Sequence, residues 1–226
     1  MGKSIPNWQP PPPPPRAPML GQSCRLEPLS SQHIQQLWES FSLDKKAEDW
    51  AYVGIGPYDD FETFEKDFES LIEAKAAMFH AVVDLKTKRA VGTASFRSIN
   101  CDFGSIEIGG LFFSTLMQRT TLSTETIILM MRRAFELGYR RFEWRCNTLN
   151  SRSVSAAIRY GCCFEGIFRN DMIARGCNRD TAWFSITDEE WPSLNRVYQS
   201  WLDIVSRNEH KSLSSMVALA KQSDAK

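Results

Sequence analysis

Apolar and polar residues follow the spacing of secondary structure from about residue 24 to about residue 190. At the start of this region, residues 24–29 form a strand-like run. Ser30 then caps a helix whose apolar residues recur every three to four positions. A second helix begins at Asp59 or Asp60 and carries a stripe of phenylalanine, leucine and isoleucine. These patterns predict a short strand followed by two amphipathic helices.

Strand-like segments dominate the next part of the chain. Residues 78–84 and 90–98 are joined by a short, mostly charged segment, which predicts a hairpin. Residues 105–113 form a further strand with the Gly109–Gly110 pair in its middle, and glycines inside a strand mark a bulge or a close backbone approach. A long helix is predicted from about residue 121 to residue 137.

The last patterned region contains a strand, a short helix and a hairpin. Residues 141–146 alternate between charged and apolar positions, and Asn150 caps a helix that stops at Gly161. Two further strands, at about 163–172 and 180–186, flank a polar turn. The resulting order, β-α-α-β-β-β-α-β-α-β-β, predicts a mixed α/β (α+β) sheet. No G-x-G-x-x-G segment opens a helix, so a doubly wound dinucleotide-binding domain is not expected.

Both ends of the chain lack this patterning. Residues 1–20 are rich in proline, and the run from Pro10 to Pro15 favours polyproline II. We interpret them as a flexible leader that lies on its own domain, with docking to an SH3-like or WW-like groove as the alternative. Residues 206–226 are polar and weakly patterned, which predicts a flexible, frayed tail. One folded domain at 21–205 remains.

Composition narrows the classes of partner. The chain has 226 residues, of which 42% are hydrophobic, and its 27 basic residues balance its 27 acidic residues. This balance leaves no excess of basic residues of the kind that nucleic-acid binding needs. No run approaches the roughly 20 apolar residues of a membrane span. Because the N-terminus also lacks an apolar signal segment, we expect a cytoplasmic protein, with the nucleus as the alternative, and no nucleic-acid or membrane partner.

Cysteine usage fits a reducing compartment. The six cysteines include no C-x-x-C pair and have no nearby histidine at ligand spacing. A zinc site, another metal site or a disulfide framework is therefore not expected, and buried free thiols are the simpler interpretation. Of the three histidines, His80 falls within a strand, where we expect a core or edge role.

The segment that joins the glycine-bearing strand to the long helix is the best candidate for chemistry. The N-terminus of a helix carries unpaired N–H groups and a partial positive charge, which suit a phosphate. Arg119 adds a cation, and hydroxyl groups add donors. These hydroxyl groups belong to Thr120, Thr121, Ser123 and Thr124. The alternative is that they only cap the helix, and taken alone the segment favours that alternative.

The element order and three segments together resemble a known family. The segments are IEIGGLFF, QRTTLSTETIILMMRRAFELGYRRFEWRC and NTLNSRSVSAAIRYGCCFEG. They resemble the GNAT superfamily of acyl-CoA N-acyltransferases, and within it the ribosomal-protein N-terminal acetyltransferases of the RimJ/RimL kind. The similarity spans residues 24–190. It implies the GNAT fold, a mixed and mostly antiparallel sheet with helices on both faces, and acetyl-CoA as co-substrate.

The resemblance also implies a set of acetyl-CoA contacts. In the family, a loop after the bulged strand binds the diphosphate: Gln118 matches its first position, whereas Thr121 and Ser123 stand where small residues are usual. Glu125 matches a glutamate common in the first turn of the following helix, where a carboxylate is favourable in any case. The implied contact residues are Leu111, Phe112, Phe113, Gln118, Arg119, Thr120, Thr121, Leu122, Ser123, Thr124 and Asn150.

Three residues are implied in catalysis. Ser153 lies in a matching Asn-x-x-Ser pattern and becomes the acid that returns a proton to the leaving thiolate, with a simple capping role as the alternative. Tyr160 is a weaker alternative acid. Glu107, on the bulged strand, is the implied base for the amine, directly or through water, with a solvated strand carboxylate as the alternative.

The acceptor stays open at this point. The resemblance implies an acetyl-CoA-dependent N-acetyltransferase in which a primary amine attacks directly in a ternary complex. The amine is a protein N-terminal α-amine or a small-molecule amine, and the enzyme is a monomer or a homodimer. The alternative, motivated by Thr121 and Ser123, is a degenerate CoA-binding module without turnover that acts as an interaction protein.

Overall fold

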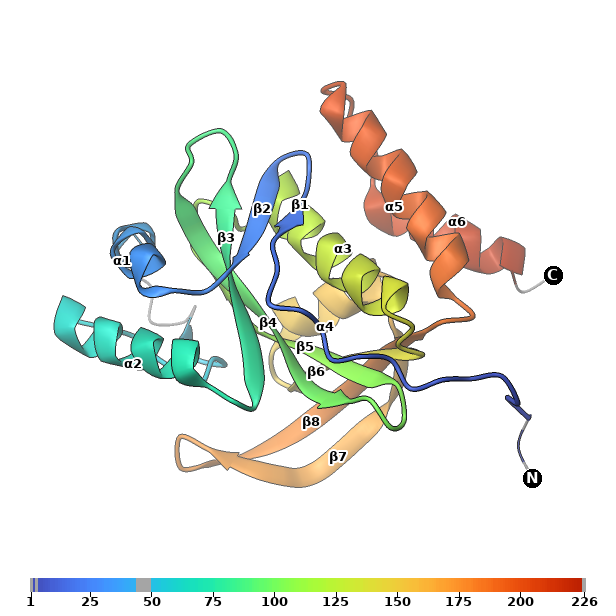
Figure 1. Cartoon of the computed structure of the whole chain (residues 1–226), viewed down its shortest axis with the longest axis horizontal. Coiled ribbons are helices and arrows are strands. Elements are labelled where there is room, and N and C mark those ends of the chain that lie inside the picture. The colour runs from blue at the N-terminus through green and yellow to red at the C-terminus, as the bar shows by residue number, and fades with distance from the viewer. Residues whose placement is uncertain (1, 3, 44–49, 225–226) are drawn as a thin grey trace.

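An eight-stranded sheet organises the residues described in the computed structural model, which are 2, 4–43 and 50–224 (Figure 1). The strand order is β1-β2-β3-β4-β5-β6-β8-β7, and neighbouring strands are antiparallel except β5 and β6, which are parallel. The strands are β1 (Met19–Leu20), β2 (Cys24–Pro28), β3 (Ala77–Asp84), β4 (Ala90–Asn100), β5 (Ser105–Phe113), β6 (Arg141–Asn147), β7 (Cys163–Ala174) and β8 (Cys177–Thr187). The mixed, mostly antiparallel sheet is thereby confirmed.

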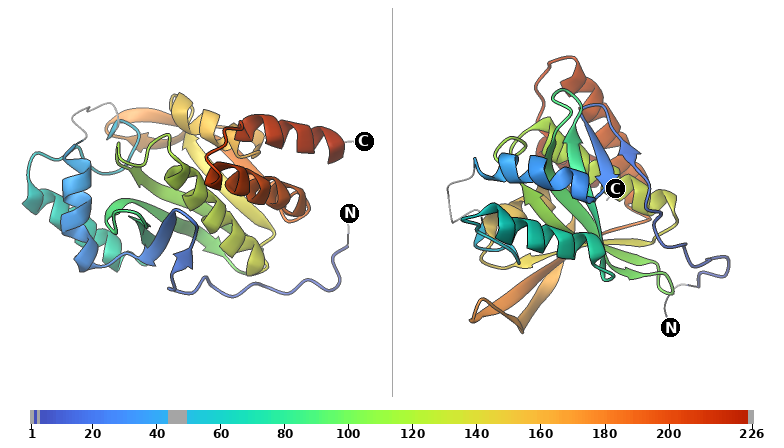
Figure 2. Two further views of the ribbon diagram at one scale, coloured as in Figure 1. Left: turned by 90° about the horizontal axis from the view of Figure 1, so that it is seen from above. Right: turned by 60° about the vertical axis from the view of Figure 1, so that its left-hand side comes forward.

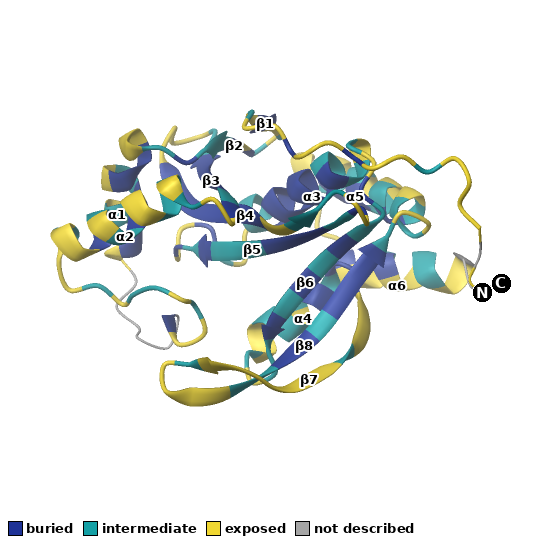
Figure 3. Ribbon diagram, turned by 60° about the horizontal axis from the view of Figure 1, so that its bottom comes forward, coloured by how far each residue is buried: buried dark blue, intermediate teal, exposed yellow. Residues whose placement is uncertain are grey.

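The parallel pair β5 and β6 separates partway along its length. Pairing runs from Ser105 opposite Arg141 to Ile108 opposite Trp144. Beyond this point β5 bulges away: Gly110 has a φ of +54°, and a Cβ there would collide with the Phe79 ring. This confirms the bulge predicted from the glycine pair. The two strands therefore diverge and leave a wedge between them (Figure 3).

One face of the sheet is covered by α1 (Ile34–Phe41) and α2 (Phe61–Glu73), which pack beside β3 and β4 (Figure 1). Asp60 is the N-cap of α2 and accepts a 2.8 Å hydrogen bond from the Thr63 N–H, so the predicted cap is confirmed. Phe64 and Phe68 stack at the centre of this apolar cluster. Both predicted amphipathic helices therefore form and bury their apolar stripes.

The opposite face is covered by α3 (Thr121–Glu136), α4 (Ser151–Arg159), α5 (Trp191–Ser206) and α6 (Leu213–Asp224) (Figure 2). The β6 alternation is confirmed, because Phe142, Trp144 and Cys146 are all buried on this side. Asn150 caps α4 by accepting a 3.1 Å hydrogen bond from the Ser153 N–H. Helices thus lie on both faces, as predicted.

The C-terminal region corrects the sequence analysis, which ended at the last strand and expected a frayed tail from residue 206. Helix α5 follows that strand, and its buried residues have helical spacing, a signal that was available in the sequence. Those residues are Leu194, Tyr198, Trp201 and Leu202. Helix α6 then occupies most of the expected tail and buries Leu213 and Val217. Because α6 has so few apolar residues, its sequence pattern does not predict a helix. The helix is identified only by its packing against the rest of the fold.

The proline-rich leader lies against α3, which agrees with the interpretation of an arm on its own domain (Figure 2). The Tyr139 hydroxyl donates a 3.1 Å hydrogen bond to the Pro12 carbonyl, and Arg133 donates a 3.0 Å hydrogen bond to the Pro18 carbonyl. Pro11 and Pro14 are buried. The leader therefore contributes to the surface of the folded unit.

Glu125 organises the turn between β1 and β2, a role that the sequence analysis did not anticipate. Its buried carboxylate accepts hydrogen bonds from the backbone N–H groups of Gln22 (2.6 Å), Ser23 (2.7 Å) and Cys24 (3.2 Å) and from the Ser23 hydroxyl. A Cβ at Gly21 would lie within 2.5 Å of this carboxylate, so a larger residue there would displace the Glu125 side chain. Glu125 therefore holds the first hairpin onto α3.

His80 makes stability depend on pH. Burial in β3 lowers the pKa of His80 from 6.5 to about 4. Between these pH values the unfolded chain binds the proton and the folded chain does not. Stability is therefore lost as the pH falls from about 6.5 to about 4. We expect His80 to lower the free energy of unfolding by about 2 kcal/mol between pH 7 and pH 5.

Urea denaturation of the native chain and His80→Gln at both pH values measures this effect. The native chain should lose about 2 kcal/mol more of its free energy of unfolding between pH 7 and pH 5 than His80→Gln does. This comparison holds whatever the substitution costs at pH 7. Equal pH dependence in the two proteins would contradict the assignment.

Candidate active site

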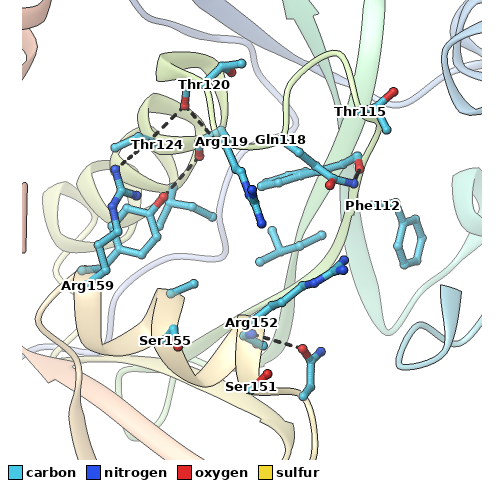
Figure 4. A pocket seen from close by; sticks show the side chains of 18 of the residues that line it. Phe112, Thr115, Gln118, Arg119, Thr120, Thr124, Ser151, Arg152, Ser155 and Arg159 are labelled. Carbon is cyan, nitrogen blue, oxygen red and sulfur yellow. Dashed lines mark hydrogen bonds between the residues drawn. The ribbon is translucent and has the colours of Figure 1, made fainter. Parts of the chain in front are cut away.

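A groove of about 2000 Å³ opens where β5 and β6 separate (Figure 4). Its walls are the end of β5, the loop and first turn of α3, the inner side of α4, and parts of the chain around residues 50–53 and 201–212. Of the predicted acetyl-CoA contacts, every one but Leu122 lines this groove. Leu122 instead packs against the apolar core. Tertiary structure therefore brings nearly the whole predicted set together.

The first turn of α3 faces the groove, and the hydroxyl protons of Thr120, Ser123 and Thr124 are donated to nearby backbone carbonyls. Thr120 donates to the Met117 carbonyl at 2.6 Å, and the Ser123 hydroxyl donates to the Thr120 carbonyl at 2.9 Å. Thr124 accepts a 3.0 Å hydrogen bond from Arg159. A hydroxyl that already donates its proton cannot also donate it to a phosphate. Backbone N–H groups of the first turn and nearby cations are thus the better anion donors here.

The loop before α3 is fixed on the end of β5. The Gln118 side-chain amide donates a 2.8 Å hydrogen bond to the Phe113 carbonyl. Arg119 follows in the left-handed region, with a φ of +59°, which is uncommon for a residue with a side chain. The Arg119 side chain points into the groove (Figure 4). The loop therefore presents a cation beside the start of α3.

Arg159, at the end of α4, adds to this positive end. The Arg159 guanidinium lies 5.2 Å from the Tyr160 ring centroid and 5.9 Å from that of Trp201, besides its bond to Thr124. Arg152, at the start of α4, also points into the groove (Figure 4). Sequence reasoning matched Arg159 to the family pattern without giving it a role, and it missed Arg152. The position of Arg152 beside Ser153 was the available signal.

Ser153 sits on the groove in the first turn of α4, with its side chain oriented by Trp144. The Trp144 indole N–H donates a 3.0 Å hydrogen bond to Ser153 Oγ. Because the Ser153 oxygen accepts this bond, its hydroxyl proton is free of Trp144, and the Cys146 thiol is a neighbouring partner for it within the chain. The Ser153 backbone is capped by Asn150, so its hydroxyl is not needed as a cap. Asn150 therefore fills the capping role considered as the alternative for Ser153, and the catalytic role of Ser153 stays a prediction.

Tyr160 lies at the other end of α4. Its hydroxyl donates a 3.4 Å hydrogen bond to the Ser123 carbonyl in the first turn of α3. Seven residues of helix separate it from Ser153, which is about 10 Å along the helix axis. Burial raises the pKa of Tyr160 and makes it a weaker acid. Tyr160 thus belongs to the positive end of the groove and not to the end that holds Ser153.

Glu107 does not line the groove. It lies on the other face of the sheet, where it pairs with Arg145 and accepts a 2.8 Å hydrogen bond from the Ser98 hydroxyl. The Arg145 guanidinium in turn stacks 4.5 Å from the centroid of the Trp183 ring. Burial lowers the pKa of Arg145. Glu107 is therefore a buried, ion-paired carboxylate and not the solvated one considered as its alternative.

Neither a metal-binding cluster nor a membrane-spanning helix occurs among the described residues. Across residues 2, 4–43 and 50–224, no three histidine, cysteine, aspartate or glutamate side chains come close enough together to hold a metal ion. None of the helices in that part of the chain has both the length and the apolar character needed to cross a bilayer. The six cysteines are free thiols, although Cys163 and Cys177 are exposed and not buried as expected.

Comparisons with known proteins point to one family. Residues 24–162 match the family described as "Acetyltransferase (GNAT) domain". A GCN5-related N-acetyltransferase from Brucella melitensis shares 36% identity, with a TM-score of 0.91 over 95% of this chain and 100% of that one. No protein of curated function matches the sequence.

Two more distant structures share the fold. The microcin C7 self-immunity acetyltransferase MccE, solved with acetyl-CoA and AMP, is 17% identical, with a TM-score of 0.64 over 74% of this chain and 93% of that one. RimL, a ribosomal L7/L12 α-N-protein acetyltransferase, is 18% identical, with a TM-score of 0.64 over 75% of this chain and 93% of that one.

Proposed function

Because the chain belongs to the GNAT acetyltransferase domain family, we propose that it transfers an acetyl group from acetyl-CoA to a primary amine. The observation that carries this proposal is the groove at the β5–β6 wedge, which has arginines at one end and Ser153 at the other. The same groove holds nearly all the residues that the resemblance assigned to acetyl-CoA. The MccE complex, which shares the fold, supports acetyl-CoA as the co-substrate.

The positive end of the groove suits the diphosphate. Unpaired N–H groups at the start of α3 and the side chains of Arg119 and Arg159 are donors for phosphate oxygens. Arg152 approaches the groove from the α4 side. The pantetheine arm then runs along the end of β5 towards the wedge. This arrangement leaves the thioester between the diverging strands.

At the wedge, the amine nitrogen attacks the thioester carbonyl carbon, the new C–N bond forms and the C–S bond breaks. Ser153 donates its hydroxyl proton to the departing sulfur and regains, through solvent, the second proton, which the attacking nitrogen loses as the amide forms. Glu107, on the opposite face and outside the groove, is proposed to accept through water the earlier proton that the ammonium form of the amine loses before it attacks. No cysteine nucleophile is needed, because the transfer is direct within a ternary complex.

The proposed acceptor is an α-amine in preference to a lysine side chain. An α-amine has a pKa near 8 and is partly neutral at cell pH, whereas a lysine near 10.4 is almost wholly protonated. A buried carboxylate that is already ion-paired, as Glu107 is, gives only modest help in removing a proton. RimL, which shares the fold, acts on a protein α-amine. A small-molecule amine is the second acceptor class to test.

A turnover assay tests the proposed function. Free thiol release from acetyl-CoA is measured with short peptides that begin with serine or alanine and with a panel of small amines. Faster release with peptides is the expected result, and faster release with a small amine would shift the acceptor class. Acetyl-CoA should also raise the melting temperature, because it binds the folded chain. Binding without turnover would identify a degenerate module, and the absence of both would overturn the proposal.

Replacing Arg119 with asparagine is expected to raise the KM for acetyl-CoA about tenfold and to leave kcat within about twofold. The substitution removes a charge-assisted contact to phosphate, which the ground and transition states share. Asparagine is chosen because it tolerates the left-handed backbone at this position. Steady-state kinetics measure the effect, with Arg196→Asn on the exposed side of α5 as the matched control. An unchanged KM would exclude Arg119 from the phosphate site.

A further inference from the structure

Strand β7 carries apolar side chains on an open edge of the sheet. It is the last strand in the sheet order, and β8 is its only partner among the described strands. Nearly all of its residues are exposed, as the yellow ribbon in Figure 3 shows. Phe168 is 54% exposed and Ile173 is 82% exposed. An apolar edge strand is a template for pairing with another chain, and natural proteins seldom leave one uncovered.

The sequence of β7 is symmetric about Asn170. Reading outward from it, Arg169 is balanced by Asp171, and then come two apolar residues on each side. These four apolar residues are Phe168 and Met172, followed by Ile167 and Ile173. Opposite charges thus lie at matching distances from the centre, and apolar residues match beyond them. Such a pattern is complementary to itself when it is reversed.

The register of β7 keeps this symmetry in three dimensions. A bulge at 169–171 sets Phe168 opposite Thr181 and Met172 opposite Arg179 on β8. Because these partners are two residues apart, Phe168 and Met172 lie on the same face of the sheet. By the same count Ile167 and Ile173 share the other face. The centre is fixed, since the Asn170 N–H donates a 2.8 Å hydrogen bond to Asp180.

We propose that β7 is a dimer interface, in which two copies of this chain place their β7 strands antiparallel about a two-fold axis through Asn170. Arg169 then faces the partner's Asp171, and Phe168 faces the partner's Met172 on one face of the joined sheets. On the other face Ile167 meets the partner's Ile173. A two-fold contact of this kind uses the same surface on both subunits.

Two further observations support a second copy as the occupant. Arg169 and Asp171 are both exposed, so a partner can reach their charges, which within this chain act on Asp180 and Arg145. Ile167 also lines an apolar hollow of about 380 Å³ between α4 and β7, together with Ile158 and Phe164. The partner's Ile173 would reach this hollow. The symmetric placement of Arg169 and Asp171 about Asn170 is complementary to a reversed copy of the same strand, and not to a strand of unrelated sequence.

Charge reversals test the pairing without touching the groove. Arg169→Asp and Asp171→Arg each place like charges opposite each other twice in a homodimer. Sedimentation velocity over a range of concentrations should show a dimer for the native chain. Each single variant should have a dimer dissociation constant raised at least about tenfold. Mixing the two variants restores both opposite-charge pairs, so the mixture should return to within about threefold of the native value.

Controls separate the interface from folding. Arg196→Asp, an exposed charge reversal on α5, should leave the dissociation constant unchanged, and circular dichroism should be the same for every variant. A native chain that stays monomeric over the whole range would overturn the proposal. Single variants with the native dissociation constant would overturn it as well, because the dimer would then use another surface. A mixture that fails to recover would refute the two-fold register through Asn170.

Discussion

Replacing Ser153 with alanine is expected to lower kcat about 100-fold and to leave the KM for acetyl-CoA within about threefold. Ser153 lies in the first turn of α4, whereas Arg119 and Arg159, the proposed phosphate donors, lie before α3 and at the end of α4. Loss of the proton donor therefore affects the breaking C–S bond and not ground-state binding. Steady-state kinetics with saturating amine measure both constants, and acetyl-CoA binding by calorimetry checks the second independently.

The contact between Trp144 and Ser153 supplies a second arm for this experiment. Trp144→Phe keeps an aromatic ring in the core but removes the N–H that orients Ser153 Oγ. It should lower kcat by less than Ser153→Ala does, about tenfold, and should add little when the two substitutions are combined. Ser70→Ala, on the exposed side of α2, is the matched control and should leave kcat unchanged.

An unchanged kcat in Ser153→Ala would remove Ser153 from the reaction. Water would then be the better proton donor. The Tyr160 hydroxyl bonds to the Ser123 carbonyl in the first turn of α3, and Tyr160 lies about two helical turns from Ser153 along α4. Tyr160→Phe distinguishes water from Tyr160 as the proton donor. If water is the donor, the substitution should weaken acetyl-CoA binding at the positive end of the groove more than it lowers kcat. A large loss of kcat with unchanged binding in Tyr160→Phe would reverse these roles.

Replacing Glu125 with alanine is expected to lower the free energy of unfolding by about 3 kcal/mol. The carboxylate accepts hydrogen bonds from three backbone N–H groups and one hydroxyl in the turn between β1 and β2. Its removal leaves these donors without their charged acceptor and frees the first hairpin from α3. For a chain of this length the loss corresponds to about 8 °C in Tm. Urea denaturation and thermal melting both measure it.

Matched substitutions show whether the carboxylate itself is responsible. Glu125→Gln keeps the shape and one acceptor oxygen, so it should cost less than Glu125→Ala. Glu136→Ala, at an exposed position at the end of the same helix, should change stability by less than about 0.5 kcal/mol. An equal, small effect at both positions would show that the hairpin does not depend on Glu125.

The residues that the resemblance assigned to acetyl-CoA come together in one groove because they follow local order along the chain. The loop after the bulged strand and the cap of α4 are each set by residues within a few positions of one another. Gln118 bonds to Phe113 and Asn150 bonds to Ser153. The contacts assigned to acetyl-CoA and the roles assigned to Glu107, Ser153 and Tyr160 stay predictions, whereas the flexible tail expected from residue 206 is wrong because α6 folds there.

Several features of the site could not be read from the chain, because they depend on contacts between distant segments. Glu107 pairs with Arg145, 38 residues away, on a face of the sheet that alternation alone could not orient towards or away from the groove. The bond between Arg159 and Thr124 and the placement of Tyr160 beside Ser123 depend on how α4 packs against α3. Helix packing sets these distances, and no periodicity encodes them.

Sequence by itself determined the elements whose signals are local. Alternation in β6, the Asp60 cap of α2 and the glycine bulge in β5 each follow from neighbouring residues, since side-chain direction and backbone freedom are properties of short segments. Only the tertiary structure decided that Glu125 holds a turn 102 residues away at Ser23, and that the polar C-terminal segment folds as α6. A buried charge needs donors to offset its desolvation, and a weakly apolar helix needs a surface to cover; distant parts of the chain supply both.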